Sequence, residues 1–318
     1  MLASRAARPA TSPLRSFSSL AVSYFCPSIR DITLESTEEF IRRQKEFRED
    51  LVRLRNQQQE SVDQNQEAVS KRSPLSSLIY GTDKCHEFDK ELARSFSQVL
   101  ARGKYVHSLV MHEVKPDKVD EYADLVGQWY PRMARIQENC VNLVGSWRTQ
   151  VGDSDTFIHI WEYQRYEGYH SSLHKISEHA GFREFDRKLR SLIKGEKTSL
   201  MQEFSFWHTT PPRRLGGLFE LRSYTLYPGN LLEWELHWRR SLSARREVIE
   251  GVGAWFVQIG DLNTVHQLWQ FANLEQRKVC REHAWSRDGW AETVYKTAHL
   301  TQSMQSRILV PMPWSPVA

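Results

Sequence analysis

The spacing of apolar side chains changes in a regular order along residues 104–318. Runs with a period of two predict strands, and positions spaced three or four apart predict helices. Residues 152–155, Gly-Asp-Ser-Asp, are typical of a hairpin turn because Gly and Asp tolerate positive φ. In the first half we expect strands at 105–114, 144–151, 156–163 and 198–207, with helices at 119–136 and 182–192.

This pattern is repeated later in the chain. Residues 144–163 recur as 252–271, with eight of twenty positions identical, including Trp147 with Trp255. The strand before each copy recurs at an offset of 112 instead of 108, so the first copy has about one extra helical turn. Each copy has the order β-α-β-β-α-β, which predicts an α+β chain of two tandem ferredoxin-like modules.

The hairpin strands of the first copy are apolar on both faces. Phe157, Trp161 and Tyr163 point one way, and Ile158 and Ile160 point the other way. Helices can cover one face, and a second sheet must cover the other, which predicts an α/β barrel of the dimeric type. That second sheet is either the other copy in the same chain or a module of a second chain.

We divide the chain into a transit peptide at 1–25, a helical and partly disordered extension at 26–103, a first module at 104–208, a linker at 209–217 and a second module at 218–318. Residues 1–30 contain four arginines, seven serines and no acid, which is typical of a mitochondrial transit peptide. The run 15–18, Arg-Ser-Phe-Ser, resembles a processing site after Phe17. Residues 31–72 predict a charged helix with one thin apolar stripe, which could pack on the body, a membrane or a partner.

Composition excludes several classes of protein. The net charge of +4, from 43 basic and 39 acidic residues, is too small and too evenly spread for a nucleic-acid-binding protein. No apolar run is long enough for a transmembrane helix. The four cysteines are scattered, which argues against a disulfide framework or a zinc site. His170, His174 and His179 have a spacing that could bind a metal ion, but they fit a solvated helix face better. We therefore predict no metal and no cofactor.

Several segments resemble the NipSnap family. They are 203–207 (EFSFW), 220–229 (ELRSYTLYPG), 265–269 (VHQLW), 284–290 (AWSRDGW) and 304–311 (MQSRILVP), and the resemblance covers about residues 74–318. It implies a dimeric α/β-barrel fold, a mitochondrial address and no established catalytic residue. It also implies roles in mitochondrial quality control (mitophagy), through docking of autophagy receptors, and in vesicular transport.

One strand carries the strongest candidate binding residues. Glu220, Arg222 and Tyr224 alternate on one face, and His266 lies on the strand face opposite Trp269. If they face a barrel cavity, these four residues form a polar patch that could bind a small molecule or cofactor. The competing interpretation is a buried Glu–Arg pair with a structural role.

We therefore expect a non-enzymatic mitochondrial interaction or scaffold protein, with no catalytic residues. Its partners would be autophagy receptors or other mitochondrial proteins, with a matrix location. Association with the inner membrane, exposure on the outer surface and homo-oligomer formation stay open. The alternative is a binding protein or enzyme, haem-handling or monooxygenase-like, that holds haem or another hydrophobic small molecule in the barrel cavity.

Overall fold

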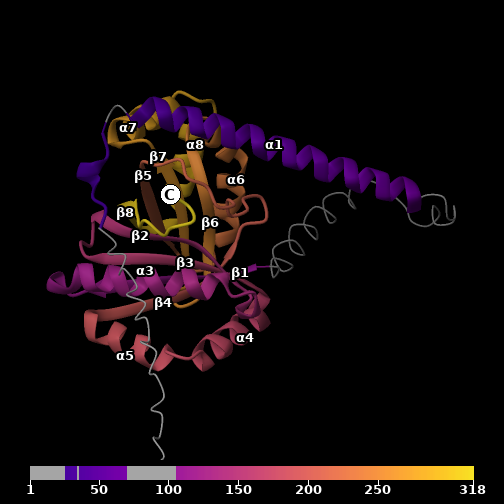
Figure 1. Cartoon of the computed structure of the whole chain (residues 1–318). Coiled ribbons are helices and arrows are strands. Elements are labelled where there is room, and N and C mark those ends of the chain that lie inside the picture. The colour runs from indigo at the N-terminus through magenta and orange to yellow at the C-terminus, as the bar shows by residue number, and fades with distance from the viewer. Residues whose placement is uncertain (1–25, 34–35, 70–104) are drawn as a thin grey trace, which may run out of the picture.

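The structure is a computed structural model that describes residues 26–33, 36–69 and 105–318 (Figure 1). The predicted transit peptide at 1–25 and the last part of the predicted extension, 70–103, lie outside these residues. The strands are β1 (Tyr105–Val114), β2 (Val141–Val151), β3 (Thr156–Gln164), β4 (Ile193–Glu203), β5 (Leu218–Leu226), β6 (Glu250–Ile259), β7 (Thr264–Phe271) and β8 (Thr301–Pro311). The α-helices are α1 (Ser36–Val69), α3 (Val119–Arg135), α4 (Arg165–Glu178), α5 (Phe182–Leu192), α6 (Leu231–Val248), α7 (Leu274–Trp285) and α8 (Trp290–Ala298).

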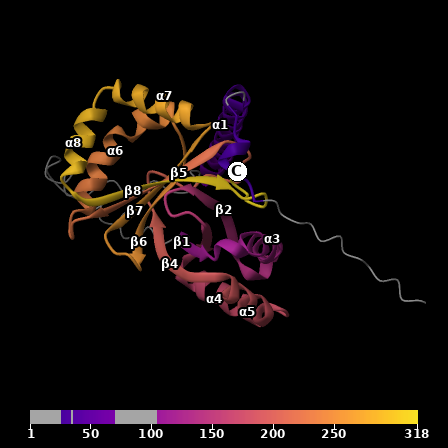
Figure 2. The same cartoon turned by 90° about the vertical axis from the view of Figure 1, so that its left-hand side faces the viewer.

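The eight strands form one closed antiparallel barrel in the order β1-β3-β2-β8-β5-β7-β6-β4. The strands of each copy are neighbours in this order, and the copies join where β2 pairs with β8 and β4 pairs with β6. Helices α3, α4 and α5 cover one side of the barrel, and α6, α7 and α8 cover the opposite side (Figure 2). The second sheet that the sequence demanded is therefore supplied by the other copy in the same chain.

The two faces of the hairpin strands are covered as predicted. Phe157, Trp161 and Tyr163 belong to the apolar cluster under the helices of the first module. Ile158 and Ile160 belong to a separate cluster inside the barrel, to which all eight strands contribute. Because these buried side chains pack in the barrel interior, the pocket described below lies outside the barrel and not in the expected barrel cavity.

Two glycines let the repeated tryptophans fold back over their own strands. A Cβ atom on Gly145 would lie 2.3 Å from Cη2 of Trp147, and one on Gly253 would lie 2.4 Å from Cζ2 of Trp255. Both glycines are at register shifts in their strands, where a bulge alters the backbone. Both indoles are completely buried inside the barrel, so the repeated Gly-x-Trp sequence is a repeated packing unit.

The first module differs from the expectation in several places. Two helices, α4 and α5, connect β3 to β4 where the apolar pattern marked one clear helix. The last strand of the first module is 193–203 instead of 198–207, because α5 runs directly into it. The extra residues of the first copy form the short 3-10 helix Gln137–Asn139, and they do not lengthen the preceding helix.

Helix α1 contacts the body through its first half. Phe40 is buried with Leu215 and Ala272, and Phe47 packs beside them. Arg48 donates a hydrogen bond to the Glu250 carboxylate at 2.9 Å. Beyond this region α1 runs past the edge of the barrel (Figure 1). None of the helices in the described ranges is long and apolar enough to cross a membrane.

Candidate functional site

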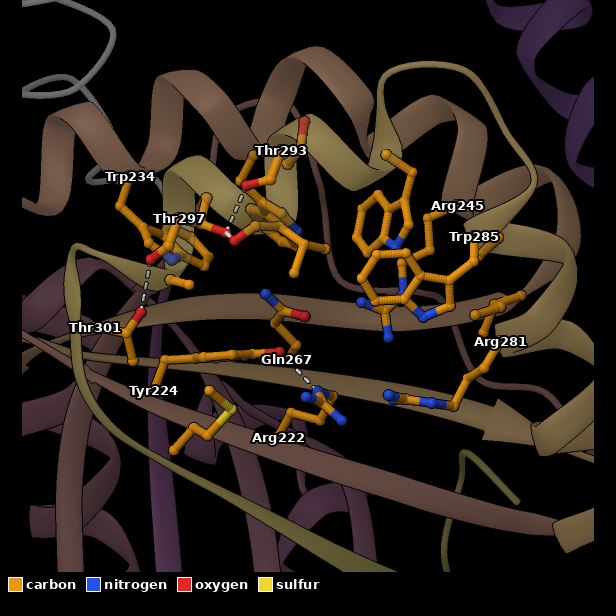
Figure 3. Close-up of a pocket in the computed structure, with 17 residues that line it drawn as sticks. Arg222, Tyr224, Trp234, Arg245, Gln267, Arg281, Trp285, Thr293, Thr297 and Thr301 are labelled. Atoms are coloured by element: carbon orange, nitrogen blue, oxygen red, sulfur yellow. Dashed lines mark hydrogen bonds between the residues drawn. The ribbon is translucent and has the colours of Figure 1, made fainter.

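A pocket of about 110 Å³ lies between the helices and the sheet of the second module (Figure 3). Its floor comes from β5, β7 and β8, and its walls come from α6, α7 and α8. Three arginines line it, Arg222, Arg245 and Arg281, and we call this site the arginine pocket. Its aromatic lining consists of Tyr224, Trp234, Trp238, Trp285 and Trp290.

The predicted alternation of Glu220, Arg222 and Tyr224 is present, but these side chains face the helices instead of the barrel interior. Arg222 donates from Nη1 to Oε1 of Glu220 at 2.8 Å and from Nε to the Tyr224 hydroxyl at 2.6 Å. Glu220 is completely buried and also accepts two hydrogen bonds from Arg277 and one from Ser306. The buried pair therefore exists, and it joins the sheet to α7.

This network fixes the charge of Glu220. Burial by itself raises the pKa of Glu220, but the hydrogen bond from Arg277 and the charge of Arg222 outweigh burial and lower the pKa to about 2. Every donor that surrounds this carboxylate stabilises its ionised form. Glu220 is consequently an anion at neutral pH, and its hydrogen-bonding capacity is taken up by the protein.

His266 lies apart from the other three candidates. Its Nδ1 is 2.8 Å from the hydroxyl of Ser223, which lies on the barrel-interior face of β5. Burial lowers the pKa of His266 to about 4, so its ring is neutral at physiological pH. The structure thus brings Glu220, Arg222 and Tyr224 together and places His266 on the other side of the sheet.

Sequence reasoning missed Arg245 and Arg281. The guanidinium carbon of Arg245 lies 4.4 Å from the ring centroid of Trp269 and 5.0 Å from that of Trp290. Burial lowers the pKa of Arg245 to about 10, and burial together with the charge of Arg222 lowers the pKa of Arg281. The repeat could have identified Arg245. At the offset of 112 its equivalent in the first copy is Met133, a buried residue on the apolar face of the helix, so a charged residue at this position is unusual.

The first module has different chemistry at the corresponding positions. Ser108 and Val110 replace Glu220 and Arg222 at the offset of 112. Beneath α3, the Tyr122 hydroxyl lies 2.7 Å from Nδ1 of His112 and 2.8 Å from Nε2 of His159. Burial lowers the pKa of both histidines, to about 4 for His112. The first module therefore has a neutral polar chain in place of the arginines.

A second group of polar side chains lies at one end of the barrel. Nε2 of His107 is 3.2 Å from the Thr209 hydroxyl and 3.3 Å from a carboxylate oxygen of Glu162. A hydroxyl–histidine–carboxylate triad needs its acid on the other ring nitrogen, so that the ring can transfer a proton. Because both contacts use Nε2 and Nδ1 lacks a partner, this cluster is not arranged as a triad.

The histidines considered for metal binding do not form a site. His170 and His174 are exposed on α4, and His174 instead approaches Glu178 at 3.5 Å. Within the described parts of the chain, no group of three or more histidine, cysteine or acidic side chains is placed to hold a metal ion.

Comparisons with known proteins place the chain in a family. The NIPSNAP family model matches residues 108–207 and 219–316, one match in each half of the barrel. Protein NipSnap homolog 2 of Homo sapiens is 37% identical over 216 residues, which cover 67% of this chain and 74% of that protein. Protein NipSnap homolog 1 of Danio rerio is 36% identical over 213 residues, which cover 67% of this chain and 76% of that protein.

Solved structures share the barrel. A protein of Fusobacterium nucleatum, whose name proposes a monooxygenase, matches with a TM-score of 0.53 and 11% identity, over 66% of this chain and 93% of that chain. At this level of identity the likeness shows the fold and not the activity. One family model matches both halves of the barrel, and two NipSnap proteins are 36–37% identical to the chain. The chain therefore belongs to the NIPSNAP family.

Proposed function

We propose that this NIPSNAP-family chain is a non-enzymatic interaction protein of mitochondria, and that the outer half of α1 is its docking element for partner proteins. The observation that carries the proposal is the extension of α1 beyond the barrel (Figure 1). From Arg48 to Val69 the helix continues for roughly 30 Å at 1.5 Å per residue. A closed barrel with a helix fixed at one end is suited to presenting that helix to other proteins.

The attachment of α1 explains why its first half would stay in place during binding. Phe40 and Phe47 occupy an apolar contact with the body, and the guanidinium of Arg213 lies 5.0 Å from the Phe47 ring. The Asn273 side-chain amide also donates to the Thr37 hydroxyl at 2.6 Å. Together these contacts orient the helix, so that its outer half leaves the body in one direction.

The described side chains at the start of the outer half include exposed apolar ones. Leu54 is 55% exposed, and the partly buried Leu51 lies three residues earlier on the same helix face, among charged neighbours such as Arg53. Exposed apolar side chains on a charged helix are typical of segments that enter a groove on another protein. Family resemblance implies autophagy receptors as partners. We propose α1, which lies outside the residues that resemble the family, as the element of this chain that binds them, and the proposed role in vesicular transport would use the same helix.

The chemistry of the arginine pocket supports a non-enzymatic role. Its basic groups are guanidinium ions, which stay protonated at neutral pH and cannot act as general bases. The neighbouring carboxylate of Glu220 is occupied by donors from the protein. Because β2–β8 and β4–β6 pairing closes the barrel within one chain, homo-oligomer formation is not required to cover the sheet.

The docking proposal is tested with purified chain and purified autophagy receptors. Leu54→Asp should weaken binding at least about tenfold if Leu54 is a central contact. Leu262→Asp is the matched control, because Leu262 is equally exposed in the β6–β7 turn of the body. Equal binding by both variants and the parent would show that α1 is not the docking element.

The proposed matrix location rests on the Arg- and Ser-rich start of the chain, and it is tested separately. Radiolabelled full-length chain should be imported into isolated mitochondria, shortened, and protected from added protease after the outer membrane is opened. A chain without residues 1–25 is the control and should stay outside. Full-length chain that remains uncut and protease-sensitive would contradict the location.

A further inference from the structure

The arginine pocket contains a buried cation without a counterion. Arg245 is only 6% exposed, and its Nε has no hydrogen-bond partner. Among the described residues neither Arg245 nor Arg281 forms an ion pair with a carboxylate, whereas Arg222 and Arg277 both bind Glu220. A buried charge is ordinarily paired, because removing it from water is costly. An unpaired guanidinium that lines a cavity therefore points to an anion that the pocket receives.

The direction of the three side chains supports this assignment. Figure 3 shows Arg222, Arg245 and Arg281 pointing toward the same space, from β5, α6 and α7 respectively. Glu220 offsets part of this charge, but its oxygens already accept from two arginines and Ser306. The pocket consequently carries an excess of positive charge that the described protein groups do not neutralise.

The walls of the pocket specify what the anion is attached to. Trp234, Trp238 and Trp290 are buried and line the cavity, while Trp285 is half-exposed on α7. Flat apolar walls favour a flat apolar body. A volume of about 110 Å³ is somewhat less than that of an apolar cavity known to hold benzene, roughly 150 Å³. The enclosed part therefore suits a single ring or a short chain.

We propose that the arginine pocket of the second module is a binding site for a small aromatic carboxylate. The carboxylate would lie among Arg222, Arg245 and Arg281, where a planar guanidinium can donate two parallel hydrogen bonds to it. The ring would lie against the tryptophans. The first module lacks this site because Val110 and Met133 stand where Arg222 and Arg245 stand in the second module.

Isothermal titration calorimetry of the full chain with benzoate tests this site. Two further probes separate the features of the ligand: benzyl alcohol has the ring without the charge, and acetate has the charge without the ring. Benzoate should bind at least about tenfold more tightly than either, since a hydrogen-bonded charge and a buried ring each account for such a factor. No binding of benzoate at millimolar concentrations, or equal binding of benzyl alcohol, would overturn the proposal.

Arg245→Met tests the role of the unpaired cation. Methionine occupies the corresponding buried position, Met133, in the first module, so the variant should fold and melt at or above the temperature of the parent. Its affinity for benzoate should fall at least about tenfold. Arg239→Met, at an exposed position of the same helix, is the matched control and should bind like the parent. Unchanged benzoate affinity in Arg245→Met would refute the assignment.

A second variant keeps the test decisive if Arg245→Met does not fold. Arg281 lies on α7 at the edge of the pocket and is only partly buried, so Arg281→Met removes a cation with little change in packing. Its benzoate affinity should fall several-fold, with an unchanged melting temperature. Parent-like affinity in this variant would likewise refute the proposed site.

Discussion

Replacing each of the two barrel tryptophans with alanine should destabilise the protein to a similar degree. Trp147 and Trp255 are both completely buried among the side chains inside the barrel. Truncating a fully buried tryptophan leaves a large cavity and costs about 3–5 kcal/mol. Because each ring lies over a glycine two residues earlier and belongs to the same repeat, neither site should relax much better than the other.

Substitution of each tryptophan by phenylalanine should distinguish the two sites by their hydrogen bonding. Nε1 of Trp255 donates to the Thr209 hydroxyl at 3.0 Å, whereas Nε1 of Trp147 is buried without a partner. Trp255→Phe loses a hydrogen bond worth about 1 kcal/mol, while Trp147→Phe removes an unsatisfied donor. Trp255→Phe should therefore be less stable than Trp147→Phe by about 1 kcal/mol or more.

Urea unfolding followed by circular dichroism measures both differences, and Trp285→Ala on half-exposed Trp285 is the control, with little loss expected. Because strands of the two modules pair with each other at two places, each variant should unfold in one transition. If both alanine variants unfolded at the parent's urea midpoint, the shared barrel core would be refuted. If Trp147→Phe were the less stable phenylalanine variant, the hydrogen-bond argument would be wrong.

Three further outcomes are expected. In a double-mutant cycle measured by thermal unfolding, Glu220→Gln should lower the stability by about 3–5 kcal/mol. Arg222→Met should lower it less, because Glu220 keeps its other donors. A coupling energy near zero would contradict the buried pair. Stability should fall in two steps as the pH is lowered. Between about 6.5 and 4 the unfolded chain, but not the folded chain, protonates His112, His159 and His266, and between about 4.5 and 2 protonation of Glu220 removes about 3 kcal/mol. Acid titration at constant urea would show both steps, and a flat profile would contradict them. Gly217→Ala should cost about 3 kcal/mol, since its φ is +79° and a Cβ would lie 2.1 Å from the Phe271 carbonyl oxygen, whereas Gly195→Ala, in open space, should unfold like the parent.

Much of the candidate site was readable before the fold was known. The alternation of Glu220, Arg222 and Tyr224 follows from the period of two in a strand, so these three residues had to share one face. Which face that was could not be read, because the strand is covered on both sides. Arg245 was not predicted as a site residue for a related reason. The apolar pattern of a helix shows which face a side chain lies on, but not which side chains of distant elements pack against it.

The sequence by itself determined the two-module architecture. Its repeat, its alternating periods and its doubly apolar hairpin strands required a second sheet, because both faces of each strand had to be buried. Local signals of this kind act over a few residues, so they identify elements and their order. They also identified Trp147 and Trp255 as equivalent core residues.

Only the tertiary structure decided how those modules are assembled. The same apolar faces would be buried equally well by a second chain, and the choice depends on the linker and on the pairing of β2 with β8 and β4 with β6. The closed barrel then directs its polar residues to two separate places: His266 to the interior, and the arginines to the space beneath α6, α7 and α8. Charge pairing depends on distances between residues far apart in the chain, which is why the unpaired Arg245 became visible only in the folded protein.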